Sequence, residues 1–302
     1  MNLKKLGFAV SLLTLALVIG LVVFATRRVE GAASTVVVVN PANLHGWAPQ
    51  ARDADGNPVP LNAPPCNGSV NFVNGPATPP FGVGSVQLKT GDGTTGGDCS
   101  GEVRNSNYQG VKLSDLAALS YWTYDVSNNG QQFPYLEIYV NNSGGTDVDD
   151  ALFFEPPYQS PGQGGVGCAN QAPTLMVTWQ QWNALSGCWW SNDGTLNPGT
   201  GTGTLADYLA VHPNATIVNS STGGGIHFVV GFASPQDQFD GNVDGFRIAT
   251  SSSDTTFDFE PAPPVPTSKD QCKNGGWQNF ARANGSAFKN QGDCIQYVNT
   301  GK

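Results

Sequence analysis

The chain has 302 residues, a formal net charge of −9 and only 12% charged residues, together with 38 glycines and 21 prolines. Residues 34–262 hold five Lys or Arg against 20 Asp or Glu, which gives this segment a net charge of −15. Such a surface repels phosphate backbones, so the class of nucleic-acid-binding proteins is excluded. It favours calcium or neutral, hydroxyl-rich partners.

The N-terminal residues 1–33 have the layout of a secretory signal peptide. Two lysines precede an apolar run that ends at about Ala25, and small residues follow it. This order predicts a mature protein that begins at Ser34 and is secreted or held at the cell surface. The apolar run is also long enough to span a bilayer, so an uncleaved N-terminal anchor is the alternative, and it would be the chain's one contact with a membrane.

Short apolar or alternating runs dominate residues 34–260, and turn-forming Gly, Asn, Ser and Pro separate them. At least ten such runs occur, among them STVVVVN, SVNFVNG, PYLEIYVNN, GIHFVVGF and TTFDFEP. The pattern predicts an all-β domain, an antiparallel β-sandwich or jelly roll. One short helix is expected inside it, in GTLADYLAVHP, where Thr204 is the N-cap and Pro213 ends the helix.

Six cysteines in an exported chain predict disulfide bonds. They fall into three sequential pairs that each close a local loop, and no C-x-x-C spacing is present to chelate zinc. Free or metal-bound thiols are the alternative. The expected pairing is Cys66–Cys99, Cys168–Cys188 and Cys272–Cys294.

Two glutamates are candidate catalytic residues. In YLEIYV, Tyr135, Glu137 and Tyr139 share one face of an expected strand, and Glu155 ends the next run, ALFFE. A hairpin centred near Thr146 would place Glu155 almost opposite Glu137, and two carboxylates across a groove are typical of a glycosidase acid and nucleophile. The alternatives are solvated strand faces, or a face that binds sugar or calcium.

Other catalytic signals are absent from the sequence. The histidines belong to no H-x-x-H or H-E-x-x-H pattern, and no nucleophile elbow or phosphate loop is present. His227, in GIHFVV, is expected to be a strand histidine that is satisfied by hydrogen bonds. The preferred interpretation is therefore a protein without catalytic residues.

Aromatic residues concentrate in TWQQWNALSGCWWSND. Flat indole faces exposed on a sheet stack against sugar rings, so these tryptophans predict a glycan-binding platform. The alternative is that they fill the core of the sandwich. The candidate ligand-binding residues are Trp179, Trp182, Trp189, Trp190, Tyr135 and Tyr139.

A proline-rich linker, residues 261–267, is expected to separate the sandwich from a C-terminal module, residues 268–302. Thr267 or Ser268 is the expected N-cap of one short helix, and Asn290 that of a second. A module this short needs a covalent cross-link to fold stably, and a Cys272–Cys294 disulfide would supply it. The module is therefore interpreted as an α-hairpin, and its partner is the acidic sandwich, an anionic wall polymer or nothing.

The segments VDGFRI and FDFE resemble the closing strands of exported bacterial jelly-roll domains of the carbohydrate-binding, galactose-binding-like or concanavalin-like kind. The C-terminal module resembles a cysteine-bracketed ending found on other exported bacterial proteins. These resemblances imply a fold, a location outside the cell, and glycan or calcium binding, and they carry over no catalytic residue. The matching residues are Val243, Asp244, Phe246, Ile248, Asp258, Phe259 and Glu260.

Asp244, Asp258 and Glu260 are the candidate metal ligands. If the two segments pair near an edge of the sandwich, the three carboxylates approach one another, and calcium would relieve their repulsion. The alternative is that Asp258 and Glu260 face water.

The sequence thus predicts an exported, non-catalytic protein that binds glycan or another cell-surface component, with calcium as a possible structural cofactor. The competing hypotheses are a glycoside hydrolase or lyase that uses Glu137 and Glu155, and a purely structural surface or adhesion module.

Overall fold

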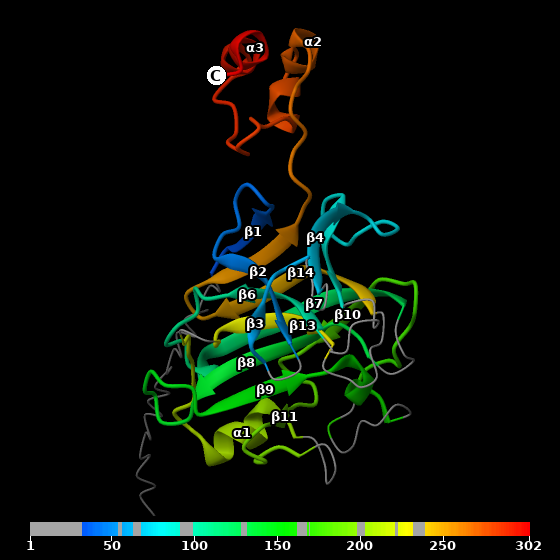
Figure 1. Cartoon of the computed structure of the whole chain (residues 1–302). Helices are drawn as coiled ribbons and strands as arrows, with labels where there is room; N and C mark the ends of the chain where they lie inside the picture. The colour runs from blue at the N-terminus through cyan, green and yellow to red at the C-terminus, as the bar shows by residue number, and fades with distance from the viewer. Residues whose placement is uncertain are drawn as a thin grey trace, which may run out of the picture. The chain divides into compact units, whose positions relative to one another are not determined.

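The computed structural model describes residues 32–53, 56–62, 68–90, 99–127, 132–161, 168, 170–197, 203–220, 223–231 and 239–302. Two β-sheets stack face to face around a hydrophobic core (Figure 1). The first sheet contains β1 (Ser34–Val39), β15 (Asp254–Phe259), β14 (Asp240–Thr250), β5 (Gly84–Lys89), β4 (Ser69–Asn74), β7 (Leu116–Ser127) and β10 (Gln180–Asn183). The second sheet contains β11 (Trp190–Ser191), β9 (Asp150–Phe154), β8 (Tyr135–Asn141), β13 (Ile226–Val230), β6 (Cys99–Asn105), β2 (Trp47–Asp53), β3 (Pro58–Val59) and β12 (Thr216–Ile217).

The alternation of side chains along each strand explains the sandwich. On β8, Leu136, Ile138 and Val140 are fully buried in the core, while the residues between them point to the outer face of the second sheet. The predicted all-β sandwich is confirmed. One strand pair departs from the antiparallel prediction, because β1 runs parallel to β15. These two strands lie at opposite ends of the sandwich's amino-acid sequence, so no hairpin joins them and forces them to be antiparallel.

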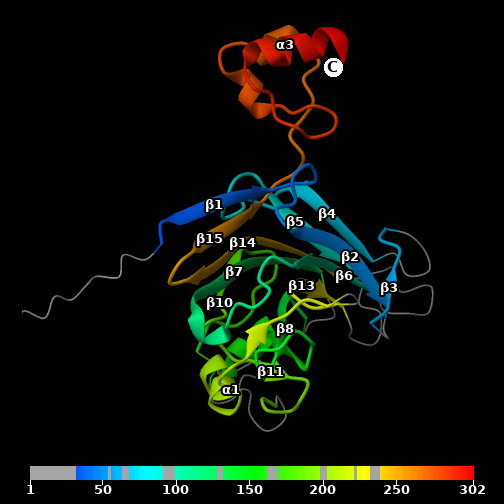
Figure 2. The ribbon, with the colours of Figure 1, turned by 90° about the vertical axis from the view of Figure 1, so that its left-hand side faces the viewer.

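Helix α1 (Leu205–Val211) lies beside β9 and β11, at the edge of the second sheet (Figure 1, Figure 2). Thr204 is its N-cap, as predicted, and forms a capping box with Asp207. The buried Tyr208 fixes the helix to β9, because its hydroxyl donates to the Asp150 carboxylate at 2.8 Å. Among the described residues of the sandwich, short helical turns also occur at η1 (Leu113–Asp115) and η2 (Pro156–Gln159).

Two of the three predicted disulfides are confirmed. Cys168–Cys188 and Cys272–Cys294 are bonded, with S–S distances of 2.06 and 2.01 Å. Cys99 is also disulfide-bonded. Its predicted partner, Cys66, lies outside the described residues, so that pairing stays a prediction.

The C-terminal segment contains α2 (Lys269–Cys272), η4 (Gly276–Asn279) and α3 (Gln291–Thr300). Ser268 caps α2, and the Asn290 side chain accepts a hydrogen bond from Asp293 N at the start of α3. A small core of Cys272, Phe288 and Cys294 joins the helices. The predicted disulfide-stapled pair of helices is therefore confirmed, and its division from the sandwich at residues 261–267 stays a prediction.

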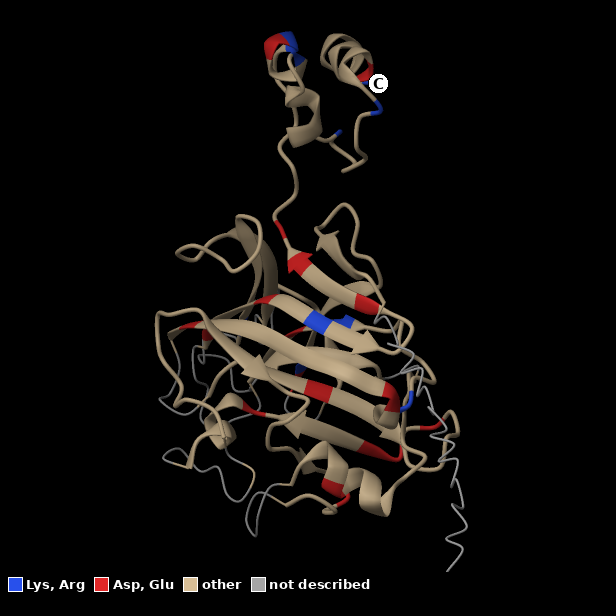
Figure 3. Cartoon of the chain, turned by 180° about the vertical axis from the view of Figure 1, so that it is seen from behind, with Lys and Arg blue, Asp and Glu red and all other residues tan. Residues whose placement is uncertain are grey.

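The predicted signal peptide or anchor, residues 1–33, lies almost wholly outside the described residues. Within the described ranges, no helix combines the length and the hydropathy that crossing a bilayer requires. Seen from the side opposite to Figure 1, several strands of the sandwich carry acidic residues and few carry basic ones, as the composition predicts (Figure 3).

Candidate functional site

The outer face of the second sheet carries a row of ionisable side chains from strands that are distant in sequence. β13 lies between β6 and β8, and its His227 pairs in register with Glu137 of β8. Glu102 of β6 pairs with Gln50 of β2, so Arg52, two residues further along β2, projects from the same face. The fold therefore gathers two carboxylates, a guanidinium and an imidazole on one surface.

Arg52 is the centre of this network. Its guanidinium forms a bidentate ion pair with Glu102, through Nε to Oε1 and through Nη2 to Oε2 at 2.6 Å. Nη2 also lies 3.2 Å from Glu137 Oε2, and Nη1 donates to the Tyr139 hydroxyl at 2.9 Å. Arg52 is 7% exposed and Glu102 is fully buried, so both charges depend on each other for solvation.

His227 is satisfied by hydrogen bonds, as expected for a strand histidine. Its Nδ1 lies 2.8 Å from Glu102 Oε2 and its Nε2 lies 2.9 Å from the carbonyl oxygen of Gly224. Burial by itself would raise the pKa of Glu102. The hydrogen bonds with His227 and Arg52 outweigh it and hold that pKa far below its usual range.

A cavity of about 420 Å³ opens beside this network. Its size is that of a small-molecule site. Glu137 of β8 and Glu155, which directly follows β9, both line it, so the structure brings the two candidate carboxylates together. The other described lining residues with a polar or aromatic side chain are Arg52, Gln132, Phe133, Tyr135, Phe153 and Trp190.

The two carboxylates of the cavity have different surroundings. Burial raises the pKa of Glu137, against the attraction of His227 and Arg52. Burial also raises the pKa of Glu155, and a hydrogen bond from Trp190 is what opposes it. Glu137 is thus part of the ion-pair network, whereas Glu155 is not.

Trp190 and Glu155 form a unit at one end of the cavity. The Trp190 ring stacks on Phe153, with centroids 3.9 Å apart and planes inclined by 13°, as expected from the register of β11 and β9. Trp190 Nε1 donates to Glu155 Oε1 at 2.7 Å. The stacked pair presents an aromatic surface with a carboxylate fixed beside it.

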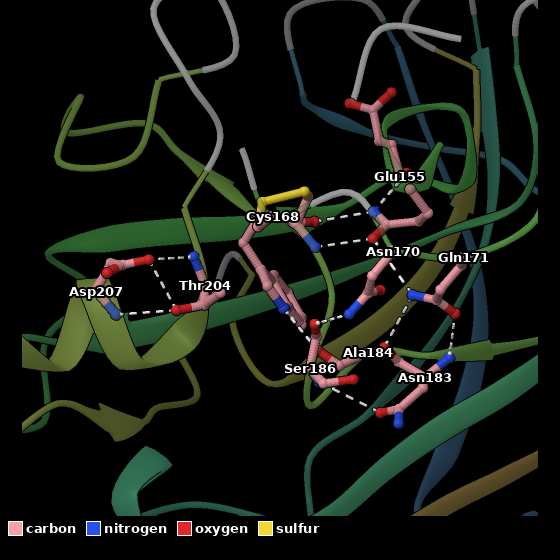
Figure 4. Close-up of a disulfide and its surroundings, with 12 residues drawn as sticks. Glu155, Cys168, Asn170, Gln171, Asn183, Ala184, Ser186, Thr204 and Asp207 are labelled. Atoms are coloured by element: carbon pink, nitrogen blue, oxygen red, sulfur yellow. Dashed lines mark hydrogen bonds between the residues drawn. A yellow bond between two sulfur atoms is a disulfide. The ribbon is translucent and has the colours of Figure 1, made fainter. Parts of the chain in front are cut away.

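Gln159 holds the backbone of this unit, and sequence reasoning missed it. The buried amide donates from Nε2 to the carbonyl oxygens of Glu155 and Cys188, both at 2.9 Å, and Oε1 accepts from Cys188 N at 2.8 Å. Figure 4 shows the Cys168–Cys188 disulfide and, near it, Glu155, whose carboxylate is directed away from the disulfide. These three hydrogen bonds hold the backbone at the end of β9 close to the backbone before β11, and they so position Glu155 and Trp190.

The structure separates the predicted platform residues. Trp190 and Tyr135 line the cavity, and Tyr139 lies on the same sheet face, where its hydroxyl accepts from Arg52. Trp179 lies elsewhere, because it precedes β10 in the first sheet, where its ring packs against Tyr124 at 5.5 Å between centroids. The predicted residues therefore do not form one continuous platform.

The prediction that Trp182 and Trp189 belong to a glycan-binding platform is wrong. Both are fully buried in the core and have no face for a sugar. Their indole N–H groups are satisfied inside the protein, Trp182 by Thr123 Oγ1 and Trp189 by the carbonyl oxygen of Ala184, both at 2.8 Å.

The candidate metal ligands lie around the segment that leads into β5. Asp244 is fully buried, with Oδ1 accepting from Phe259 N and Oδ2 from Phe81 N. Glu260 Oε1 accepts from Val83 N at 2.6 Å. Burial raises the pKa of Asp244 to about 8, and burial together with Glu260 raises that of Asp258 to about 6.

These carboxylates do not form a ready metal cage. Among the described residues, no group of three His, Cys, Asp or Glu side chains has an arrangement that holds a metal ion. Asp258 is only 7% exposed, and its Oδ1 is buried without a hydrogen-bond partner in the described part of the chain.

No family model matches the chain, and no curated protein matches it. Among solved structures, it is similar to the family 11 carbohydrate-binding module of the cellulosomal cellulase Lic26A-Cel5E of Clostridium thermocellum. The identity is 12%, the match covers 69% of this chain and 89% of that chain, and the TM-score is 0.37. A likeness at this level carries no argument about function, which is inferred instead from the residues of the cavity.

Proposed function

We propose that the protein binds glycan, without catalysis, in the cavity on the outer face of the second sheet. The observation that supports this is the unit of Trp190, Phe153 and Glu155 at the cavity. Aromatic rings pack against the C–H faces of a sugar, and a fixed carboxylate accepts hydrogen bonds from its hydroxyl groups. Tyr135 and Glu137, on the adjacent strand, add a second aromatic ring and a second carboxylate to the cavity lining.

Replacing Trp190 by Ala is expected to weaken glycan binding at least tenfold, because the variant loses an aromatic surface of the kind worth about 1.5–3 kcal/mol when buried. A glycan array on the mature protein identifies a ligand, and titration calorimetry then compares the variants. Trp179→Ala is the matched control, since Trp179 is half-buried and outside the cavity lining. Unchanged affinity in Trp190→Ala would move the site away from this cavity.

A glycoside hydrolase or lyase is the second candidate, because Glu137 and Glu155 line one cavity and differ in their surroundings. Glycosidases use such a pair as acid and nucleophile or base. Incubating the array ligands with the protein separates the candidates. If product is released and Glu155→Gln abolishes this release, the protein is an enzyme and the binding proposal is wrong. If no glycan on the array is bound, a structural surface or adhesion module is favoured.

We further propose a structural calcium ion at Asp258, with Asp244 and Glu260 as the other carboxylates near it. The buried, unpartnered Oδ1 of Asp258 supports this proposal. Calcium at 100 times its dissociation constant should stabilise the fold by about 2.7 kcal/mol. Thermal unfolding with calcium and with chelator measures the increment, which Asp258→Asn should remove and the control Asp254→Asn, on the same strand, should leave. Equal melting temperatures with calcium and with chelator would contradict the proposal.

We also propose that the protein is exported and acts at the cell surface or beyond it. The confirmed disulfides support an oxidising compartment, because such bonds are rare in the cytosol. The proposed cleavage after residue 33 is tested by N-terminal sequencing of the protein recovered from the culture medium and from membranes.

A further inference from the structure

The cavity contains a carboxylate that the sandwich does not neutralise. Residues 34–262 include five basic side chains: Arg52, Lys89, Arg104, Lys112 and Arg247. Two of them are paired with acids outside the cavity lining. Lys89 forms an ion pair with Asp240 at 2.8 Å, and Arg247 forms one with Asp254 at 2.8 Å.

Arg104 and Lys112 do not supply a positive charge to the cavity lining either. Arg104 Nη2 donates to the Ser220 carbonyl oxygen, and the exposed Lys112 is not among the cavity-lining residues. The segments between residues 34 and 262 that the structure leaves undescribed contain no Lys, Arg or His in the sequence. Arg52 is therefore the one cation that residues 34–262 contribute to the described lining of the cavity.

Arg52 is already committed to other carboxylates. It pairs bidentately with Glu102, which does not line the cavity, and it reaches Glu137 at 3.2 Å. Glu155 is left with Trp190, whose Nε1 donates to Oε1. In the described part of the chain, no basic group pairs with Glu155.

An acid beside a stacked indole is a site for an organic cation. A carboxylate attracts an ammonium group, and an indole face adds a favourable cation–π interaction. A ligand ammonium would also lower the raised pKa of Glu155, which a neutral hydroxyl group does only weakly. An anionic sugar would instead meet two glutamates.

We propose that the cavity selects glycans with free amino groups, and that an amino-sugar ammonium pairs with Glu155 and lies against Trp190. This inference rests on the proposed function, because it names the class of glycan for the same cavity. N-acetylation removes the ammonium charge and leaves the sugar ring, so it separates this recognition from ring stacking alone.

The test compares three β-1,4-linked tetrasaccharides by titration calorimetry on the mature protein at about pH 6: glucosamine, N-acetylglucosamine and glucose. Most of the sugar amines carry a proton at this pH, because primary amines beside electron-withdrawing carbons still titrate above it. The glucosamine tetramer should bind at least tenfold more tightly than the other two. Glu155→Gln, which keeps the side-chain shape, should bring this ratio close to one.

Two controls separate the cavity from the general attraction of an acidic protein for a polycation. Asp115→Asn removes the same unit of charge from an exposed position outside the cavity, and it should preserve the ratio. Trp190→Ala should weaken binding of the glucosamine tetramer.

Three results would overturn the inference. Equal or tighter binding of the acetylated or glucose tetramer would refute amine selection and leave glycan binding standing. A ratio that Glu155→Gln does not change would refute the role of Glu155. No binding of any tetramer, combined with silence on the glycan array, would overturn the proposed function as well.

Discussion

Replacing Arg52 with Met is expected to lower the free energy of unfolding by about 3–5 kcal/mol, because it leaves Glu102 charged, buried and without its bidentate partner. In the intact protein Glu102 is fully buried and Arg52 is only 7% exposed, so the charge of Glu102 is stabilised by protein groups rather than by solvent. Met keeps much of the apolar stem of Arg52, which isolates the loss of the guanidinium. Urea or guanidinium unfolding of the full chain measures the change.

The matched control is Arg247→Met. Arg247 also pairs bidentately with an acid, Asp254, but its side chain is 46% exposed, so its loss should cost less than about 1 kcal/mol. The double variant Arg52→Met/Glu102→Gln should recover part of the stability that Arg52→Met loses, since it removes the unpaired charge. Similar losses for the two arginine variants would show that the buried network contributes no more than a surface pair.

The pH dependence of stability tests the same ion pair in a second way. The pKa of Glu102 is lower in the folded chain than in the unfolded chain, so the unfolded state binds more protons in acid, and the free energy of unfolding rises with pH in that range. The contribution of Glu102 is complete above its unfolded pKa of about 4.3 and is lost as the pH falls through the folded pKa. Without Arg52 the folded pKa rises, so the variant should lose stability less steeply on acidification.

Local alternation predicted the parts of the site that lie on one hairpin. The pattern YLEIYV placed Glu137 on the outer face, and ALFFE placed Glu155 on the same face of the next strand. The register differs from the expected one, because Glu137 pairs with Phe153 rather than lying opposite Glu155. The turn is centred one residue earlier than expected, which shifts the pairing by two and leaves the face unchanged.

Alternation also separates two of the tryptophans. Trp189 and Trp190 are neighbours in an extended segment, so their side chains point to opposite faces: Trp189 enters the core and Trp190 lines the cavity. From the sequence alone, both are candidates for the platform. Which of the two faces the core depends on the pairing of β11 with β9, and that pairing spans a long loop.

The ion-pair network was not predictable from a single sequence. Arg52 and Glu102 are 50 residues apart, and Glu102 and His227 are 125 apart. They meet because β6 lies between β2 and β13, an order that no local pattern encodes. Burial of the three side chains was equally hidden, since Glu and Arg on a strand normally indicate a solvated face.

The second large effect is expected in the C-terminal segment. Its core of buried residues consists of Cys272, Phe288 and Cys294, so the disulfide supplies two of the three members. Further apolar side chains pack against this core and are themselves only partly buried: Trp277, Phe280, Ile295, Tyr297 and Val298. A segment of this length buries too little apolar surface to fold unaided, so the cross-link is the main source of its stability.

The double variant Cys272→Ala/Cys294→Ala is therefore expected to unfold residues 268–302, while the sandwich stays folded. The two cysteines are 22 residues apart, and closing a loop of that size contributes about 3 kcal/mol in the entropic model. Hydrogen exchange on the full chain should show lost protection in α3 and unchanged protection in β8 and β13. The control Cys168→Ala/Cys188→Ala removes a bond of similar separation, 20 residues, and should leave α3 protected. Persistent protection of α3 without Cys272–Cys294 would show that contacts other than the disulfide hold this segment.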